Sequence, residues 1–159
     1  MAESTDHDAP DASDLALPRA GSSLAWFGTT PFVVLSVWLY AIASDHPWRD
    51  GTIELLVIYA ALFLSFLGGV RWGTAMTADR AKGSFDLVVS VLPMLAAWAS
   101  FALETPYTFA ALAVLFAAAG AWDALSAGDR ATPAWYGRLR VRQTAVIVAT
   151  MVLAFAATG

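Results

Sequence analysis

The chain has 159 residues, of which 58% are hydrophobic and only 14% are charged. Soluble domains carry about 25% charged residues, so this composition argues against a soluble globular protein. The formal net charge of −4 reflects acidic residues gathered near the N-terminus, and no basic cluster of the kind that binds nucleic acid is present. The absence of cysteine excludes disulfides, thiolate metal sites and cysteine nucleophiles. With two histidines as well, we expect neither a metal site nor a bound cofactor.

Residues 1–22 are rich in Asp, Ala, Ser and Pro and show no apolar periodicity. A segment of this composition cannot bury enough apolar surface to fold by itself. We predict a disordered, acidic, cytoplasmic tail over residues 1–22, followed by a membrane domain over residues 23–159.

Five apolar runs follow this tail. A helix rises 1.5 Å per residue, so about 20 residues cross the hydrocarbon core of a bilayer. The predicted spans are residues 24–43, 53–74, 85–103, 107–125 and 141–158. Short polar connections such as Ser44–Gly51 and Glu104–Pro106 separate them. The sequence therefore predicts an all-α integral membrane protein with five transmembrane helices in one bundle.

The basic residues indicate how these spans are oriented. With five spans, the tail, the 75–84 loop and the 126–142 region lie on the same side of the membrane. That side holds Arg19, Arg80, Lys82, Arg130, Arg138, Arg140 and Arg142, and the other side holds only Arg49. Because Lys and Arg are retained on the cytoplasmic side during insertion, we predict a bacterial inner-membrane protein with a cytoplasmic N-terminus and a periplasmic C-terminus.

The second predicted span carries small residues at close spacing. Ser65, Gly69 and Gly73 recur at every fourth position, and Gly68 adjoins them. This pattern lets two helix backbones approach closely within lipid. We predict tight helix packing through these four residues, with a hinge or the close approach of a ligand as the alternative.

Three charged residues fall inside the predicted spans. Arg71, Asp86 and Asp123 come from three different spans, each near its cytoplasmic end, and Ser90 lies one turn from Asp86 on the same helix face. Intramembrane charges tend to pair with one another or to line a cavity. These four residues form a candidate intramembrane polar cluster. Three interpretations stay open: a paired structural cluster, residues that merely reach the headgroups, or a proton or substrate site.

Four short motifs resemble those of a known family. They are Ser65–Gly73 (SFLGGVRWG), Gly28–Phe32 (GTTPF), Ser90–Pro93 (SVLP) and Pro133–Tyr136 (PAWY). Together they resemble the domain of unknown function 3429 family, whose members are similar to transmembrane protein 69. The resemblance covers about residues 24–150. It implies a helical inner-membrane protein, bacterial or mitochondrial, and it brings no established activity.

These observations favour a structural, interaction or assembly role over catalysis. No grouping of His, Asp and Glu has the spacing of metal ligands, so we expect no enzyme. The expected partners are the lipid bilayer and either another membrane protein or a second copy of the chain. The alternative is a small-solute or proton carrier that acts as an oligomer, because five short spans leave little room for a pathway within one chain.

Overall fold

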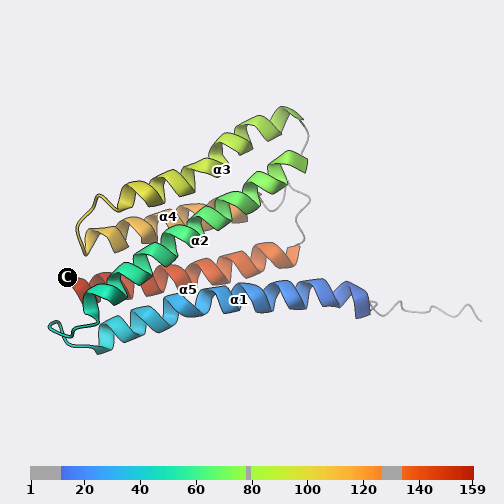
Figure 1. Cartoon of the computed structure of the whole chain (residues 1–159). Coiled ribbons are helices and arrows are strands. Elements are labelled where there is room, and N and C mark those ends of the chain that lie inside the picture. The colour runs from blue at the N-terminus through green and yellow to red at the C-terminus, as the bar shows by residue number, and fades with distance from the viewer. Residues whose placement is uncertain (1–11, 78–79, 127–133) are drawn as a thin grey trace, which may run out of the picture.

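The computed structural model describes residues 12–77, 80–126 and 134–159, and all regular secondary structure in these ranges is α-helical. The helices are α1 (Ala12–Ala41), α2 (Arg49–Thr77), α3 (Arg80–Ser100), α4 (Tyr107–Ser126) and α5 (Ala134–Thr158). They lie side by side with alternating direction along the chain, and the C-terminus lies at the end opposite the start of α1 (Figure 1). The prediction of an all-α bundle is confirmed for the described residues.

Four of the helices form a ring. α1 packs along α5, α5 along α4, and α2 contacts both α1 and α4. α3 lies outside this ring against α2 and, to a lesser extent, against α4 (Figure 1). Within the described ranges, no Cα atoms of α2 and α5 approach within 8 Å of each other. Contacts between α2 and α5 are therefore made by side chains and not by close approach of the two backbones.

An aromatic cluster forms the centre of the bundle. Phe32 of α1 is fully buried and meets three rings edge-on, with centroid distances of 5.1 Å to Tyr59, 5.3 Å to Phe63 and 5.5 Å to Phe116. Edge-to-face contacts at these distances are the favoured geometry for aromatic pairs. They join α1, α2 and α4 at mid-height. The Tyr59 hydroxyl donates to the Gly28 carbonyl at 2.8 Å, which fixes α1 against α2.

The outer surface is apolar, whereas polar side chains lie inside. Large exposed side chains cover every helix and include Phe27, Trp38, Leu62, Phe66, Val88, Trp98, Val114, Leu125 and Val152. The buried polar side chains include Thr29, Ser36, Arg71, Ser90, Arg140, Gln143 and Thr150. Soluble monomers rarely expose apolar surface on this scale. This distribution is that of a protein surrounded by lipid.

Four helices are long and apolar enough to cross a bilayer. Their candidate spans are Arg19–Ala41, Arg49–Met76, Tyr107–Leu125 and Trp135–Thr158. The apolar part of α3, Ser84–Ser100, has 17 residues and is therefore about 25 Å long. The described helices are thus those of a membrane protein, and α3 has the shortest apolar segment of the five.

The start of the first helix differs from the prediction. α1 begins at Ala12, so residues 12–22 belong to a helix and not to a disordered tail. Residues 1–11 lie outside the described part of the chain. The added helical turns pack on α5, because a Cβ atom at Gly21 would lie 3.1 Å from the Trp135 ring. The absence of a side chain at Gly21 lets α1 continue beside α5 beyond the apolar run.

Two other helix ends also differ from the predicted ones. α5 begins at Ala134 and not near residue 141, because the Arg140 charge is paired within the bundle and does not have to precede the helix. α3 ends at Ser100, three residues earlier than predicted, and the Leu103 carbonyl accepts a hydrogen bond from Thr108 of α4 at 2.6 Å. The predicted loop regions 75–84 and 126–142 are partly helical. Their remaining residues, 78–79 and 127–133, lie outside the described residues.

Candidate functional site

A salt bridge joins α2 to α4 near the end of the bundle that holds the start of α1. Nη2 of Arg71 donates to Oδ1 of Asp123. The Arg71 side chain is only 7% exposed, and its Cζ atom lies 5.5 Å from the centroid of the Trp122 ring. A guanidinium over an aromatic face gains electrostatic stabilisation from the ring. Arg71 is therefore held inside the bundle by a carboxylate and an aromatic ring of the same neighbouring helix.

Asp123 also pairs with a second arginine. Nε of Arg140, on α5, donates to Oδ2 of Asp123 at 3.1 Å, so that each carboxylate oxygen faces one guanidinium. Arg140 is 3% exposed, and its Nη1 donates to Oε1 of Gln143 at 2.8 Å. The carboxylate therefore bridges two cations that would otherwise repel each other in a poorly solvated interior.

Gln143 extends these contacts to α1. Its Nε2 donates to the Ala25 carbonyl at 2.8 Å and to Oγ1 of Thr29 at 2.9 Å. Thr29 in turn donates to the same Ala25 carbonyl at 2.9 Å. We call the side chains of Thr29, Arg71, Asp123, Arg140 and Gln143 the polar layer. This layer joins α1, α2, α4 and α5, which are the four helices of the ring.

The polar layer has an unequal number of charges. Arg71 and Arg140 carry two positive charges and Asp123 one negative charge, so these three groups sum to +1. Burying an ion pair costs much of its Coulomb gain in lost solvation, and loss of one partner leaves a buried charge unpaired. Within the described ranges, no group of three His, Asp or Glu side chains is arranged to hold a metal ion. The two arginines and the aspartate can therefore form ion pairs and attract an anion.

The residues predicted on α3 lie outside this layer. The Ser90 hydroxyl donates to the Leu87 carbonyl of its own helix at 2.6 Å, and Ser90 packs against Gly68. Asp86 is half-buried and takes part in an interaction of its own, while both arginines pair with Asp123. Of the four cluster residues predicted from the sequence, the structure brings together Arg71 and Asp123.

The predicted packing residues also divide into two groups. A Cβ atom at Gly68 would overlap the Ser90 backbone carbonyl, so α2 and α3 meet at this glycine. A Cβ atom at Gly69 or Gly73 would meet nothing within 4 Å, and Ser65 is half-buried with its hydroxyl bonded to the Ala61 carbonyl of its own helix. Within the described chain, close packing occurs at Gly68, whereas Gly69 and Gly73 meet no other part of the chain, so close packing at these two positions stays a prediction.

Sequence reasoning missed two residues of the polar layer. In the sequence, Arg140 is one of several basic residues in the 126–142 region, and Gln143 lies within the predicted fifth span, in which no charged residue shares its face. Their spacing of three residues places them on the same helix face once α5 is known to begin before them. Arg138 and Arg142, two positions to either side of Arg140, are exposed. A helical reading of this segment places Arg140 on the face opposite Arg138 and Arg142, and this separation is the signal that could have found it.

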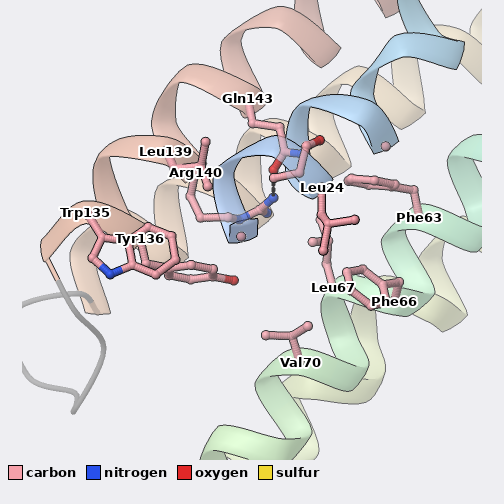
Figure 2. Close-up of a pocket in the computed structure, with 13 residues that line it drawn as sticks. Leu24, Phe63, Phe66, Leu67, Val70, Trp135, Tyr136, Leu139, Arg140 and Gln143 are labelled. Atoms are coloured by element: carbon pink, nitrogen blue, oxygen red, sulfur yellow. Dashed lines mark hydrogen bonds between the residues drawn. The ribbon is translucent and has the colours of Figure 1, made fainter. Parts of the chain in front are cut away.

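Beside the polar layer, a groove of about 410 Å³ opens between α1, α2 and α5. α1 and α2 contribute Gly21, Leu24, Ala25, Gly28, Phe63, Phe66, Leu67 and Val70, and α5 contributes Trp135, Tyr136, Leu139, Arg140 and Gln143. Figure 2 shows the apolar side chains of α2 facing Arg140, Gln143 and the Tyr136 hydroxyl on α5. The groove is therefore mostly apolar, and Arg140, Gln143 and the Tyr136 hydroxyl form a small polar part of its wall on α5.

The sequence pattern of a protein family described as "Protein of unknown function (DUF3429)" matches residues 17–156. The chain belongs to the DUF3429 family. The matched region of this DUF3429 protein contains the whole polar layer and every residue that lines the groove.

One relative extends the comparison. Transmembrane protein 69 of Xenopus tropicalis is 31% identical to this DUF3429 chain over 137 residues, which are 85% of the chain and 53% of the relative. The chain thus spans about half the length of that relative. No solved structure matches the chain. The resemblance expected from the short motifs is confirmed, and the features specific to this site come from the chain's own geometry.

Proposed function

We propose that the protein crosses the inner membrane of a bacterium five times, with its N-terminus in the cytoplasm. The starts of α1, α3 and α5 lie at one end of the bundle, together with the exposed residues Arg19, Arg138 and Arg142 (Figure 1). Arg49 lies at the other end, where it donates to the Ala157 carbonyl of α5. The positive-inside rule supports this orientation. Local thinning of the bilayer would let the 25 Å apolar part of α3 cross it.

Single cysteines test this topology directly, because the chain has none of its own. In intact cells, a membrane-impermeant maleimide is expected to label D45C and T105C but not S84C, and all three should react after permeabilisation. All three native residues are exposed, and they lie in the α1–α2 turn, the α3–α4 turn and the first part of α3. Labelling of S84C and T105C from the same side would show that α3 does not cross.

We further propose that the protein has a structural role and helps another membrane protein to assemble. The observation that carries this proposal is the polar layer, which joins four helices through hydrogen bonds that use both oxygens of Asp123. A carrier has to break and remake the contacts around its site in every cycle. A layer that ties four helices together supports a fixed shape and a non-enzymatic role.

The alternative is a small-solute or proton carrier that acts as an oligomer. Buried ionisable residues within membrane helices mark many proton and ion pathways, and the Arg71–Asp123–Arg140 contact is such a group. A carrier predicts proton or solute flux in liposomes that stops in D123N or D86N while the protein stays folded. A structural protein predicts no flux in the native form either.

Purification of the tagged full-length protein from native membranes in a mild detergent distinguishes the two roles. We expect a second membrane protein at fixed stoichiometry in the native mass spectrum, together with no proton flux above that of protein-free liposomes. A homo-oligomer without other chains that conducts protons, and loses conduction in D123N, would overturn the structural role. The exposed E54Q variant on α2 serves as the charge control for flux.

A further inference from the structure

The proposed structural role gives no function to the groove beside the polar layer. Its walls on α1 and α2 are apolar and include Leu24, Phe63 and Val70. Its wall on α5 presents Arg140 and the Tyr136 hydroxyl (Figure 2). A ligand that fits both surfaces must itself be amphiphilic, because a polar molecule would leave its own groups unpaired against the apolar walls.

Arg140 retains hydrogen-bonding capacity on this wall. Its Nε binds Asp123 and its Nη1 binds Gln143, whereas its Nη2 makes no hydrogen bond within the described chain. Tyr136 lines the same groove and has its hydroxyl on the side of α2. Because the two arginines outnumber the one carboxylate, the layer carries an extra positive charge. An anion in the groove would balance this charge in a poorly solvated site.

The groove is short and has an exposed apolar rim. It runs along α1 from Gly21 to Gly28, which at 1.5 Å per residue is about 10 Å. Its rim includes Leu24, 71% exposed, and Phe66, 64% exposed. The groove therefore opens onto the apolar surface, from which a lipid chain would enter.

We infer that this groove binds one anionic membrane lipid, with an acyl chain along α1 and α2 and its phosphate against Arg140. The inference rests on the membrane-embedded topology proposed above and is independent of the assembly role. Arginine suits this position because its guanidinium donates several hydrogen bonds in a fixed geometry that matches phosphate oxygens.

Native mass spectrometry of the full-length protein tests the headgroup. The purified protein is mixed with equal amounts of phosphatidylglycerol and phosphatidylcholine that carry the same acyl chains. One phosphatidylglycerol per chain is expected, with about tenfold preference over phosphatidylcholine, because both lipids offer a phosphate but only phosphatidylglycerol brings a net negative charge that balances the layer. R140Q should abolish this preference, since Asp123 keeps Arg71 as its partner. R142Q removes the same charge from an exposed position of α5 and should leave the preference unchanged.

A second variant tests the chain-binding walls without altering any charge. V70W places a large side chain in the groove and is expected to remove the bound lipid, whereas L62W, at an exposed position of α2 outside the groove, should retain it. Equal retention of the two lipids by the native protein would overturn the proposal, as would a V70W protein that keeps its lipid. A dimer that V70W converts to a monomer would likewise overturn it, by showing that a second copy fills the groove. The cysteine labelling described above reports separately whether the topology holds.

Discussion

Replacement of Asp123 by asparagine is expected to destabilise the protein by about 3–5 kcal/mol, the range for removing one partner of a buried ion pair. Asparagine keeps the size of the side chain but not its charge. Arg71 and Arg140, 7% and 3% exposed, would then face each other without the carboxylate between them. Equilibrium unfolding in mixed micelles with increasing SDS, followed by tryptophan fluorescence and circular dichroism, measures the change.

Two further variants isolate the contribution of the polar layer. E54Q removes a carboxylate from an exposed position of α2 and should change the stability by less than about 0.5 kcal/mol. R140Q in the D123N background removes one of the two unpaired cations, so the double variant should be less destabilised than the sum of the single ones. A D123N protein as stable as E54Q would show that the layer does not hold the bundle together.

G68A is expected to destabilise the protein by about 1–3 kcal/mol, the usual cost of overpacking. A Cβ atom there would overlap the backbone carbonyl of Ser90, and no side-chain rotation relieves a clash with backbone. The helices α2 and α3 would have to separate locally. The same SDS titration measures this effect, and it should be accompanied by weaker protection of α3 amides against hydrogen exchange.

The neighbouring glycine provides a matched control. A Cβ atom at Gly69 meets nothing within 4 Å, so G69A should be neutral or stabilise the helix by up to about 1 kcal/mol through backbone entropy. Equal loss of stability in the two variants would mean that α2 packs through both faces, for example against a second chain at Gly69. Loss of stability in G68A without a loss in G69A is the result that the packing of α3 on α2 requires.

The helical architecture followed from run length and composition. Each of the predicted segments 24–43, 53–74 and 107–125 lies almost wholly within one described helix, because in lipid an apolar chain of this length satisfies its backbone groups as a helix. The helix ends were less predictable. Charges at residues 138–142 indicate an aqueous segment when read singly, and only the contact with Asp123 shows that Arg140 belongs inside the bundle.

For the candidate site too, the sequence indicates some features and only the tertiary contacts decide the others. Arg71 and Asp123 were recognisable as costly charges within spans, and a pair was one of the interpretations left open. Ser90 shares a helix face with Asp86, but its hydroxyl bonds to its own helix, and its backbone carbonyl faces Gly68. Periodicity gives the face on which a residue lies, not the neighbour that this face meets.

The sequence by itself determined the class of protein, the number of helices in the described ranges and the family. These properties depend on local quantities: the length of each apolar run, its freedom from charge, and short motifs. The tertiary structure decided which charges pair, which glycine is in contact, and where the groove lies. Those outcomes depend on how the helices are rotated and arranged around the ring, and this arrangement is set by packing among residues up to 118 positions apart, as between Gln143 and Ala25.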